Sequence, residues 1–361
     1  MVSDLKPTVA VVILNWNGRK YLEQFLPSVL AYSAGAELIV ADNASTDDSI
    51  SFLRAHYPAV RIIKFSENYG FCEGYNKALF QIKADYFVLL NSDIEVTPHW
   101  LEPIIALMET NPGIAACQPK IKSFYRRNFF EYAGAGGGYL DFLGYPFCRG
   151  RLFETLEEDK GQYNDIVPVF WATGACMFVR AKAYQEAGGL EPAFFAHMEE
   201  IDLCWRLQRM GYTIMYCGHS EVYHVGGGTL PKSSPRKTYL NFRNGLAMLY
   251  KNIPPAQVFE IFFIRILLDW VAALKFLANG DYKDAQAVFI AHRDVWQNRK
   301  YLQEQKRKLS FSEKKLKGFY HRSIVLDYFI NRKTTFRALN IPDRTSLPAQ
   351  AFPDIHPKSQ H

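Results

Sequence analysis

Leu89-Leu90-Asn91-Ser92-Asp93-Ile94-Glu95-Val96 joins an apolar run, which begins at Tyr86, to a short polar turn. Such a run is typical of a buried strand that delivers polar side chains to the edge of a sheet. A carboxylate between apolar flanks needs a partner, because an unpaired buried charge is costly. A divalent cation carried by a phosphorylated ligand would be one. Alone, the stretch also fits a strand that ends in a turn, with Asp93 capping the next helix.

The segments around this stretch alternate between two patterns. Strand-like apolar runs are predicted at residues 9–16, 37–41, 61–65 and 85–90, and amphipathic helical patterns lie between them. Strands and helices that alternate with short connections predict an α/β fold, in which right-handed crossovers build a parallel sheet covered on both faces.

Polar side chains follow each of the four predicted strands. They are Asn15-Trp16-Asn17, Asp42-Asn43, Asn68 and Asn91-Ser92-Asp93. In parallel sheets, ligands bind outside the carboxyl ends of the strands. The sequence therefore predicts a binding crevice along this edge.

The second half of the chain adds another charged cluster. Residues 123–165 are glycine-rich and read as a long irregular insert, either a lid or binding loop or a plain surface excursion. Order resumes at residues 167–180. Glu199-Glu200-Ile201-Asp202 then begins an amphipathic helix, whose N-terminal dipole tolerates anions. A strand pattern and Tyr223-His224 follow.

Charge and cysteine content indicate the compartment and the kinds of partner to expect. The 361 residues carry a formal net charge of +6, and residues 299–333 hold eleven Lys/Arg against three Asp/Glu, so the remainder is slightly acidic. The six cysteines show no metal-ligand spacing and read as reduced thiols of a cytosolic protein. The N-terminus lacks a signal-peptide pattern. Only the basic segment hints at nucleic acid, so no nucleic-acid partner is expected.

The C-terminal third contains a strongly apolar stretch, residues 258–277, interrupted by Glu260, Arg265 and Asp269. Charges inside a membrane span are costly, although Arg265 and Asp269 can pair on one helix face. A helix lying in the membrane interface beside residues 299–333 fits the pattern, and a helix packed on the catalytic domain is the alternative.

The predicted division has three parts. It comprises a catalytic domain over 1–250 (donor half about 8–120, acceptor half about 165–250), a helical and membrane-associating extension over 251–335, and a flexible tail over 336–361.

An ordered set of motifs resembles one known family. They are Val11-Val12-Ile13-Leu14-Asn15-Trp16-Asn17-Gly18, Val40-Ala41-Asp42-Asn43-Ala44-Ser45-Thr46-Asp47, Glu67-Asn68-Tyr69-Gly70-Phe71 with Gly74 and Asn76, Leu89-Leu90-Asn91-Ser92-Asp93, Thr173-Gly174-Ala175-Cys176-Met177, Glu199-Glu200-Ile201-Asp202-Leu203-Cys204-Trp205-Arg206 and Tyr223-His224. With them the chain resembles the family 2 glycosyltransferases, inverting enzymes of the A-type glycosyltransferase fold, and most closely their rhamnosyltransferase-like branch. The resemblance implies a single Rossmann-like nucleotide-sugar-binding sheet with a C-terminal helical extension.

The resemblance also implies roles for individual residues. The residues implied to bind the nucleotide sugar are Asn15, Trp16, Asn17, Asp42, Asn68, Gly70, Asn76, Asn91, Ser92 and Asp93. Asp93 would bind the metal under the diphosphate, with His224 as a further metal or diphosphate contact. Glu200 takes the position of the catalytic base. On the acceptor side we place Trp171, Gly174 and Asp202.

Two departures from the family pattern affect this assignment. Asn91 stands where the metal motif often has a first aspartate, so one carboxylate is left and the metal is expected to arrive with the nucleotide. Glu200 replaces the usual aspartate at the base position, and Glu199 is the alternative base, with Glu200 then pairing Arg206.

Simpler roles stay open for three other residues. Asp42 could cap the helix after Ser45. His224 could be a core histidine bonded to a carbonyl, and Trp171 could simply pack in the interior.

Together these features predict a metal-dependent (Mg²⁺ or Mn²⁺) inverting glycosyltransferase in cell-surface polysaccharide synthesis. Its donor would be dTDP-rhamnose or a UDP-sugar, its acceptor a glycan or lipid-linked hydroxyl, and its place the cytoplasmic, inner face of the cell membrane. The rival hypothesis is a non-catalytic nucleotide-sugar-binding or scaffold subunit at the membrane. A nucleotidyltransferase fits less well, because Asn15-Trp16-Asn17-Gly18-Arg19 has only one glycine after the first strand.

Overall fold

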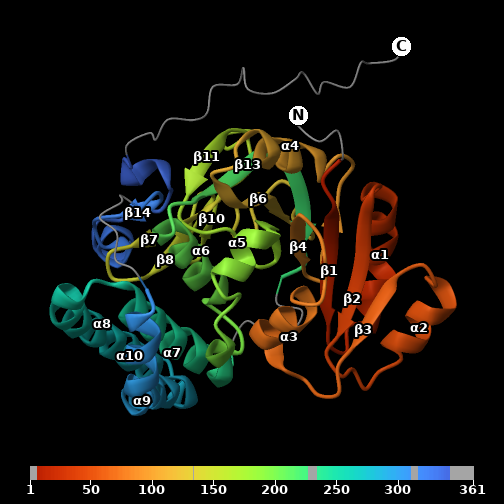
Figure 1. The fold of residues 1–361 in the computed structure, drawn as a ribbon. Helices are drawn as coiled ribbons and strands as arrows, with labels where there is room; N and C mark the ends of the chain where they lie inside the picture. The colour runs from red at the N-terminus through yellow and green to blue at the C-terminus, as the bar shows by residue number, and fades with distance from the viewer. Residues whose placement is uncertain (1–5, 133, 227–233, 310–315, 342–361) are drawn as a thin grey trace.

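The computed structural model describes residues 6–132, 134–226, 234–309 and 316–341. A large mixed sheet forms its centre, helices flank it, and a further group of helices lies at the lower left of Figure 1. The sheet has the strand order β11-β13-β6-β12-β4-β1-β2-β3, and β5 pairs with β13.

Residues 8–120, the predicted donor half, contain the parallel part of the sheet, and they confirm the predicted alternation to within a few residues. Its strands are β1 (Val9–Asn15), β2 (Ala36–Asp42), β3 (Arg61–Lys64) and β4 (Tyr86–Leu90), and the helices between them are α1 (Arg19–Tyr32), α2 (Ser49–His56) and α3 (Gly70–Leu79). In β1, Val12 packs in the core on the α3 side, whereas Val11 and Ile13 pack with Leu22 of α1. This alternation follows from the two-residue period of a strand. It explains why the strand is apolar throughout.

The register of these strands brings the predicted polar side chains to one edge. Asn15 pairs with Asp42 across β1 and β2, and Ile13 pairs with Leu90 across β1 and β4. Asn91 and the residues after it therefore leave the sheet beside Asn15. The residues predicted to line a crevice at the carboxyl ends of the strands therefore lie side by side.

The elements from residue 94 to residue 224 make the sheet mixed rather than wholly parallel, which corrects the prediction. Its elements are β5 (Ile94–Val96), α4 (Glu102–Thr110), β6 (Ile114–Ser123), β11 (Ile166–Val169), β12 (Cys176–Arg180), α5 (Ala181–Glu186), α6 (Glu199–Arg209) and β13 (Thr213–His224). β12 runs antiparallel to both β4 and β6. It follows a turn at residues 173–175 instead of a crossover helix, and antiparallel strands need no crossover.

Residues 123–165 are less irregular than predicted. They contribute most of a second, five-stranded sheet whose members are β7 (Gly138–Asp141), β8 (Pro146–Cys148), β9 (Arg151–Leu152), β10 (Thr155–Leu156) and β14 (Phe319–Tyr320). Strands of two to four residues are too short to show a period in the sequence. Gly138 is needed here because a Cβ atom at this position would lie 2.2 Å from the ring of Trp171.

The C-terminal helices are α7 (Pro235–Asn252), α8 (Val258–Ala278), α9 (Tyr282–Gln297) and α10 (Arg299–Arg307). α7 packs against α8, α9 and α10, and it also contacts α6 of the catalytic part. Residues 316–341 then return to the catalytic part, where β14 pairs with β7. The division at residues 250 and 335 stays a prediction, and the predicted tail lies mostly outside the described residues. Among the helices described, none is both long and apolar enough to span a bilayer.

Candidate active site

The first part of the site is a buried network at the ends of β1 and β2. Asn15 Nδ2 donates to Asp42 Oδ1 at 3.2 Å and to Ser45 Oγ at 3.1 Å. The backbone N–H of Ser45 donates to Asp42 Oδ2 at 3.0 Å. The residue that caps α2 is Asp48, so Asp42 does not serve as its helix cap. Asp42 instead fixes the loop that leaves β2.

Trp16 and Asn17 follow β1. The side chain of Asn17 bonds the loop after β2, whereas the ring of Trp16 is exposed. Asn17 has a positive φ of 51°, and its Oδ1 accepts the N–H groups of Thr46 at 2.7 Å and Asp47 at 3.2 Å. Asn15 and Asn17 therefore hold the 43–48 loop. Trp16 is 46% exposed, which leaves its ring available to a ligand such as a nucleotide base.

The end of β3 adds an amide network that sequence reasoning only partly anticipated. Asn43 Nδ2 donates to Asn68 Oδ1 at 3.0 Å, and the N–H of Gly70 donates to the same oxygen at 2.8 Å. Gly70 has a φ of +74°, and a Cβ atom there would lie 2.4 Å from the ring of Phe195. Glycine is therefore required where α3 begins, and Asn68 shapes this wall of the crevice.

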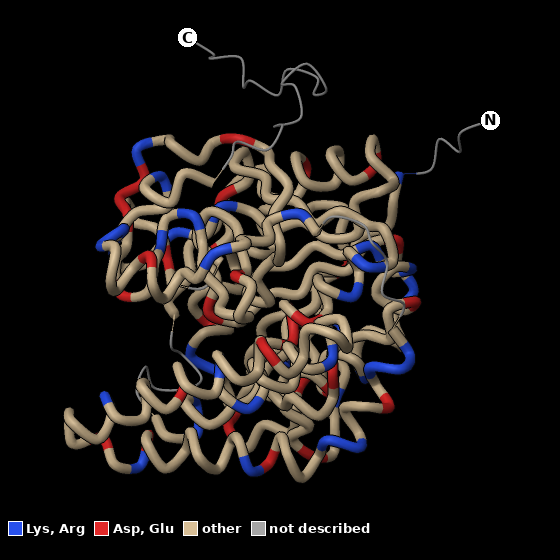
Figure 2. The backbone as a smooth tube through the Cα atoms, turned by 90° about the vertical axis from the view of Figure 1, so that its left-hand side faces the viewer, with Lys and Arg blue, Asp and Glu red and all other residues tan. Residues whose placement is uncertain are grey.

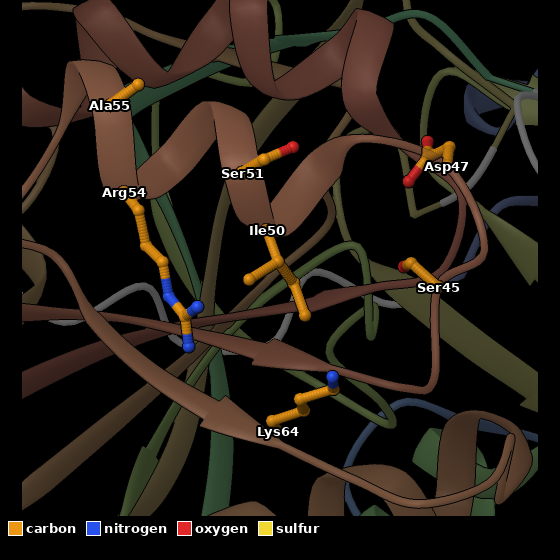
Figure 3. A pocket seen from close by; sticks show the side chains of 7 residues that line it. All are labelled: Ser45, Asp47, Ile50, Ser51, Arg54, Ala55 and Lys64. Carbon is orange, nitrogen blue, oxygen red and sulfur yellow. The ribbon is translucent and has the colours of Figure 1, made fainter.

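An open hollow of about 620 Å³ adjoins this region. It is lined by Ser45, Asp47, Ile50, Ser51, Arg54, Ala55 and Lys64, which Figure 3 shows as sticks. Ser45 is shared between the hollow and the Asp42 network. The hollow thus borders the strand-end crevice on the side of β2 and β3, and Asp93 and Glu200 do not line it.

Asp93 and His224 form the second part of the site. β5 and β13 are antiparallel, and their register pairs Ile94 with His224. His224 Nε2 lies 3.2 Å from Asp93 Oδ1, and its Nδ1 lies 3.0 Å from Glu131 Oε2. All three residues are buried. His224 thus contacts two carboxylates, and the alternative of a core histidine bonded to a carbonyl is wrong.

The charges around His224 determine its protonation. Burial opposes the imidazolium form, but the carboxylates of Asp93 and Glu131 outweigh it and raise the pKa of His224 to about 10. Glu131 holds one ring nitrogen, so the other is directed at Asp93. This is the arrangement in which a carboxylate orients a metal-binding histidine.

A divalent metal fits this arrangement only in company with a ligand. Within the described ranges, no group of three or more His, Cys, Asp or Glu side chains could hold a metal by itself. Asp93 offers a carboxylate oxygen, and His224 Nε2 offers a nitrogen once a metal replaces the proton that its pairing with Asp93 favours. Mg²⁺ commonly uses one or two protein carboxylates together with phosphate oxygens and water. The donor set therefore suits a metal that binds with a diphosphate.

The third part is the pair Glu199 and Glu200 at the start of α6. Burial and the charge of Glu200 raise the pKa of Glu199 well above its usual value. Burial also raises the pKa of Glu200, to about 7, although its carboxylate accepts the backbone N–H of Gly174. Glu199 is buried and Glu200 is half-buried, and each has one carboxylate oxygen without a hydrogen-bond partner. Glu200 is thus the more accessible and more easily ionised of the two.

A strained loop presents these glutamates. Phe195, His197 and Met198 all have positive φ values, of 64°, 72° and 71°. Such conformations cost of order 1–3 kcal/mol each in non-glycine residues, and they cluster at active sites. The carbonyl oxygen of Phe195 accepts the N–H of Phe71 at 2.8 Å, at the start of α3. The loop therefore bridges the donor and acceptor halves.

The turn at residues 173–175 joins Glu200 to the Asp93 motif. The N–H of Asn91 donates to the carbonyl oxygen of Ala175 at 2.9 Å, while Gly174 donates to the Glu200 carboxylate. Gly174 is thus a link between the two clusters. The structure brings the Asn91–Asp93 segment and Glu200 to opposite sides of one turn.

Three residues assigned to ligand contact have their side chains in the interior. Asn76 Oδ1 accepts the hydroxyl of Tyr184 at 2.7 Å. Trp171 Nε1 donates to the carbonyl oxygen of Tyr139 at 2.9 Å. Asp202 is fully buried. These contacts do not support direct roles in ligand binding for Asn76, Trp171 or Asp202. Packing is the better description of Trp171.

Asp202 instead joins α6 to α7. Its Oδ2 lies 2.9 Å from Arg206 Nε and 3.2 Å from Lys251 Nζ, and its Oδ1 accepts Asn252 Nδ2 at 2.8 Å. The alternative in which Glu200 pairs with Arg206 is therefore wrong, because Asp202 takes that position. The reason is the helical spacing: residues 202 and 206 are four apart and share a face.

Comparisons with known proteins identify the family of the chain. Residues 10–188 match the family described as glycosyl transferase family 2. The chain belongs to glycosyl transferase family 2. It is 27% identical over 239 residues to N-acetylglucosaminyl-diphospho-decaprenol L-rhamnosyltransferase of Mycobacterium tuberculosis, covering 62% of this chain and 76% of that protein. It is 25% identical over 229 residues to rhamnosyltransferase WbbL of Escherichia coli, covering 60% of this chain and 83% of WbbL. These relatives place it with the rhamnosyltransferase-like members.

The solved structures agree on the fold. A crystal structure of GalNAc-T7 with UDP, GalNAc and Mn²⁺ matches with a TM-score of 0.51 at 15% identity. The match covers 68% of this chain and about half, 48%, of that one. The chain therefore has the A-type glycosyltransferase fold, with a helical C-terminal portion.

Asn244 of α7 is a site residue that sequence reasoning missed. Its side-chain Nδ2 donates to three carbonyl oxygens of the strained loop, those of Phe194 at 3.0 Å, Ala196 at 2.8 Å and His197 at 2.8 Å. Arg243 adds a bond to Phe194 at 2.9 Å. No pattern in the sequence indicates these bonds, since their partners are almost fifty residues away. Asn244 positions the loop that presents Glu200.

Replacing Asn244 with alanine should lower the turnover number for sugar transfer by about 10- to 100-fold, because misplacing a catalytic group by about 1 Å costs on that order. Donor affinity should change little, since Asn244 contacts none of the strand-end residues. Steady-state kinetics with a donor-binding titration measures both. Asn252→Ala is the matched control: this buried asparagine of the same helix bonds Asp202 and not the loop. Equal losses of turnover in both variants would contradict the positioning role.

Proposed function

We propose that the protein is an inverting glycosyltransferase of cell-surface polysaccharide synthesis. It moves a sugar from dTDP-rhamnose or a UDP-sugar to a hydroxyl of a glycan or lipid-linked acceptor. The observation that carries the proposal is the pairing of two clusters across one turn. Asp93 with His224 offers a place for the diphosphate and its metal, and Glu200 offers a base with a raised pKa.

The donor pocket is proposed at the ends of β1 to β3. Trp16 supplies an exposed ring for the nucleotide base, and Asp42 and Asn68 supply fixed hydrogen-bonding walls. Two of the matching relatives are named as rhamnosyltransferases, and one matching solved structure holds UDP. The rhamnosyltransferase relatives support dTDP-rhamnose as the donor, and the structure with UDP supports a UDP-sugar.

Asp93 and His224 would hold the divalent metal, Mg²⁺ or Mn²⁺, together with the diphosphate oxygens. When bound, the metal neutralises negative charge on the leaving diphosphate as a Lewis acid. Glu131 would keep a proton on His224 Nδ1, since it accepts from that nitrogen, so that Nε2 is the nitrogen that loses its proton when a metal binds. Imidazole as a ligand favours Mn²⁺ slightly over Mg²⁺.

Glu200 would remove the proton of the acceptor hydroxyl as its oxygen attacks the anomeric carbon. The new carbon–oxygen bond forms on the face opposite the leaving diphosphate, whose oxygen keeps the electron pair of the broken bond. One displacement of this kind inverts the anomeric configuration. Glu200 Oε2 is buried and has no hydrogen-bond partner, so the acceptor hydroxyl would have to enter the site to reach it. Burial and the charge of Glu200 raise the pKa of Glu199 well above its usual value, which makes Glu199 the less easily ionised of the two glutamates.

The acceptor is proposed to be a glycan or a lipid-linked glycan, which places the enzyme at the inner face of the cell membrane. The Mycobacterium tuberculosis relative supports this, because its name describes a decaprenol-linked acceptor. No nucleic acid enters the proposal.

Nucleotide release from a panel of dTDP- and UDP-sugars, with Mn²⁺ and candidate acceptors, tests the function. We expect one donor to release nucleotide in an acceptor-dependent way. Calorimetry of each nucleotide with Mn²⁺ runs in parallel. Binding without release on any acceptor would favour the rival, a non-catalytic nucleotide-sugar-binding subunit.

A further inference from the structure

We propose that the outward side of α8 is a docking surface for an anionic lipid bilayer. This side, called the α8 face below, consists of Phe259, Phe263, Leu267, Trp270, Val271, Leu274 and Leu277. Its use to reach a lipid-linked acceptor rests on the proposed function. The docking itself rests on three observations: the orientation of the helix, the extent of its exposed apolar surface and the charges at its rim.

α8 is inverted relative to an ordinary surface helix, which buries its apolar face and exposes its charges. Arg265 and Asp269, two of the three charges that interrupt the apolar run, are buried and pair at 2.9 Å, whereas the third, Glu260, is exposed in the first turn. Asp269 also bonds Tyr145 at 3.0 Å and His292 at 3.1 Å. The Arg265–Asp269 pair thus anchors α8 to the protein, and the large side chains of the α8 face point outward.

The exposed area is large and continuous along the helix. Phe259 is 85% exposed, Phe263 59%, Val271 61% and Leu274 64%. The α8 face follows the three-to-four-residue period of one helix side over most of its 21 residues. At about 1.5 Å per residue, such a helix is roughly 30 Å long. Contiguous apolar patches of this kind mark interaction sites in proteins.

A second segment extends the α8 face. Leu326, Phe329 and Ile330 of η3 (Leu326–Ile330) are also exposed, and Lys275 of α8 lies 5.4 Å from the ring centroid of Phe329. Residues more than fifty positions apart thus meet at one rim. α8 lies at the left of Figure 1, and this side of the molecule faces the viewer in Figure 2. The surface is therefore broader than one helix.

The charges favour a bilayer over a second copy of the chain. Lys275 of α8 and Arg322 and Arg332 of the segment that carries η3 are exposed, against one exposed carboxylate of α8, Glu260. Lipid phosphates complement such cations, each of which is worth about 1 kcal/mol near an anionic surface. A second copy docked face to face would bring the same cations together. Because no described helix can cross a bilayer, α8 would lie in the interface.

The position of α8 suits an acceptor delivered from the membrane. α8 packs against α7, and α7 carries Asn244, which holds the loop before Glu200. Gly245, next to Asn244, would place a Cβ atom 3.3 Å from Arg265 Nη2. The lipid-facing helix is thus one helix away from the loop that presents the base.

Vesicle flotation of the full chain tests the proposal. The probes are phosphatidylethanolamine–phosphatidylglycerol vesicles and phosphatidylcholine vesicles. We expect the wild type to bind the anionic vesicles, with weaker binding to phosphatidylcholine. The triple variant Phe263→Ser/Trp270→Ser/Leu274→Ser should bind at least about tenfold more weakly. The matched control, Leu30→Ser/Phe80→Ser/Met210→Ser, changes three exposed apolar side chains on α1 and after α3 and α6, and it should bind like the wild type.

Other outcomes overturn the docking surface. Wild type that does not float, or a triple variant that floats like the wild type, would show that α8 does not bind lipid. If sedimentation in buffer also shows a dimer that the triple variant converts to a monomer, the occupant is a second copy. Transfer to a short water-soluble acceptor should be unchanged in the triple variant. Vesicle binding without any sugar transfer would contradict the proposed function and leave the docking surface supported.

Discussion

Glu200→Gln should lower the rate of sugar transfer by about 10²- to 10⁴-fold, the usual contribution of a general base. Glutamine keeps the shape of the side chain but cannot take the proton of the acceptor hydroxyl. The affinity for the nucleotide sugar should stay nearly unchanged, because the proposed donor contacts come from the ends of β1 to β4. Single-turnover transfer and calorimetric donor titration measure the two quantities.

Glu199→Gln is the matched control for this variant. Burial and the neighbouring carboxylate raise the pKa of Glu199 well above its usual value, so its carboxyl group holds a proton more readily than a free glutamate does. Glutamine resembles a protonated glutamate, and we expect a small effect on the rate. If Glu199→Gln stops transfer and Glu200→Gln does not, the base is Glu199.

Asp93→Ala should abolish the part of nucleoside-diphosphate binding that depends on metal. We expect a loss of more than about 100-fold, because a bound metal contributes several kcal/mol and each 1.4 kcal/mol is tenfold. Asp93 is the only carboxylate of the Asn91-Ser92-Asp93 motif, so no neighbour in it can replace the ligand. Calorimetry of a nucleoside diphosphate with Mn²⁺ and with EDTA separates the metal-dependent part.

Two further variants, Glu131→Gln and Glu95→Gln, test whether the loss is specific to the metal site. Glu131→Gln should weaken the same binding by about 10- to 100-fold, as expected for a residue that orients a metal-binding histidine. Glu95→Gln changes a carboxylate two residues from Asp93 that pairs with Arg127 at 2.7 Å, and should bind like the wild type. Metal-independent binding in the wild type would contradict the role of Asp93.

The donor half of the site could be predicted because it depends on one rule of parallel sheets. Each strand is an apolar run in the sequence, and the residues after neighbouring strands meet at one edge. Asn15, Asp42 and Asn91 are therefore adjacent, although more than twenty residues separate each from the next. Successive side chains of β1 pack into two different cores, so the strand is apolar from Val9 to Leu14 and is easy to recognise in the sequence.

Other features depend on contacts that leave no periodic signal. Glu131 comes from a segment without a regular pattern, yet it contacts His224 across the sheet edge. Asn244 contacts a loop almost fifty residues earlier in the chain. The resemblance places Asp202 on the acceptor side, but Lys251 of α7 pairs with it in the interior.

The orientation of α8 could not be predicted either. The sequence shows where Arg265 and Asp269 interrupt the apolar run and that they can pair. It does not show that this pair faces the protein, since that depends on Tyr145 and His292 from two other segments.

The central claim is that ionised Glu200 takes the acceptor proton, and the pH dependence of kcat/KM for transfer tests it most directly. Burial raises the pKa of Glu200 to about 7, so wild-type kcat/KM should be low in acid and rise through an ionisation near that pH. The residual rate of Glu200→Gln should lack this rise. A wild-type profile without an ionisation near neutral pH, or the same rise in Glu200→Gln, would contradict the claim.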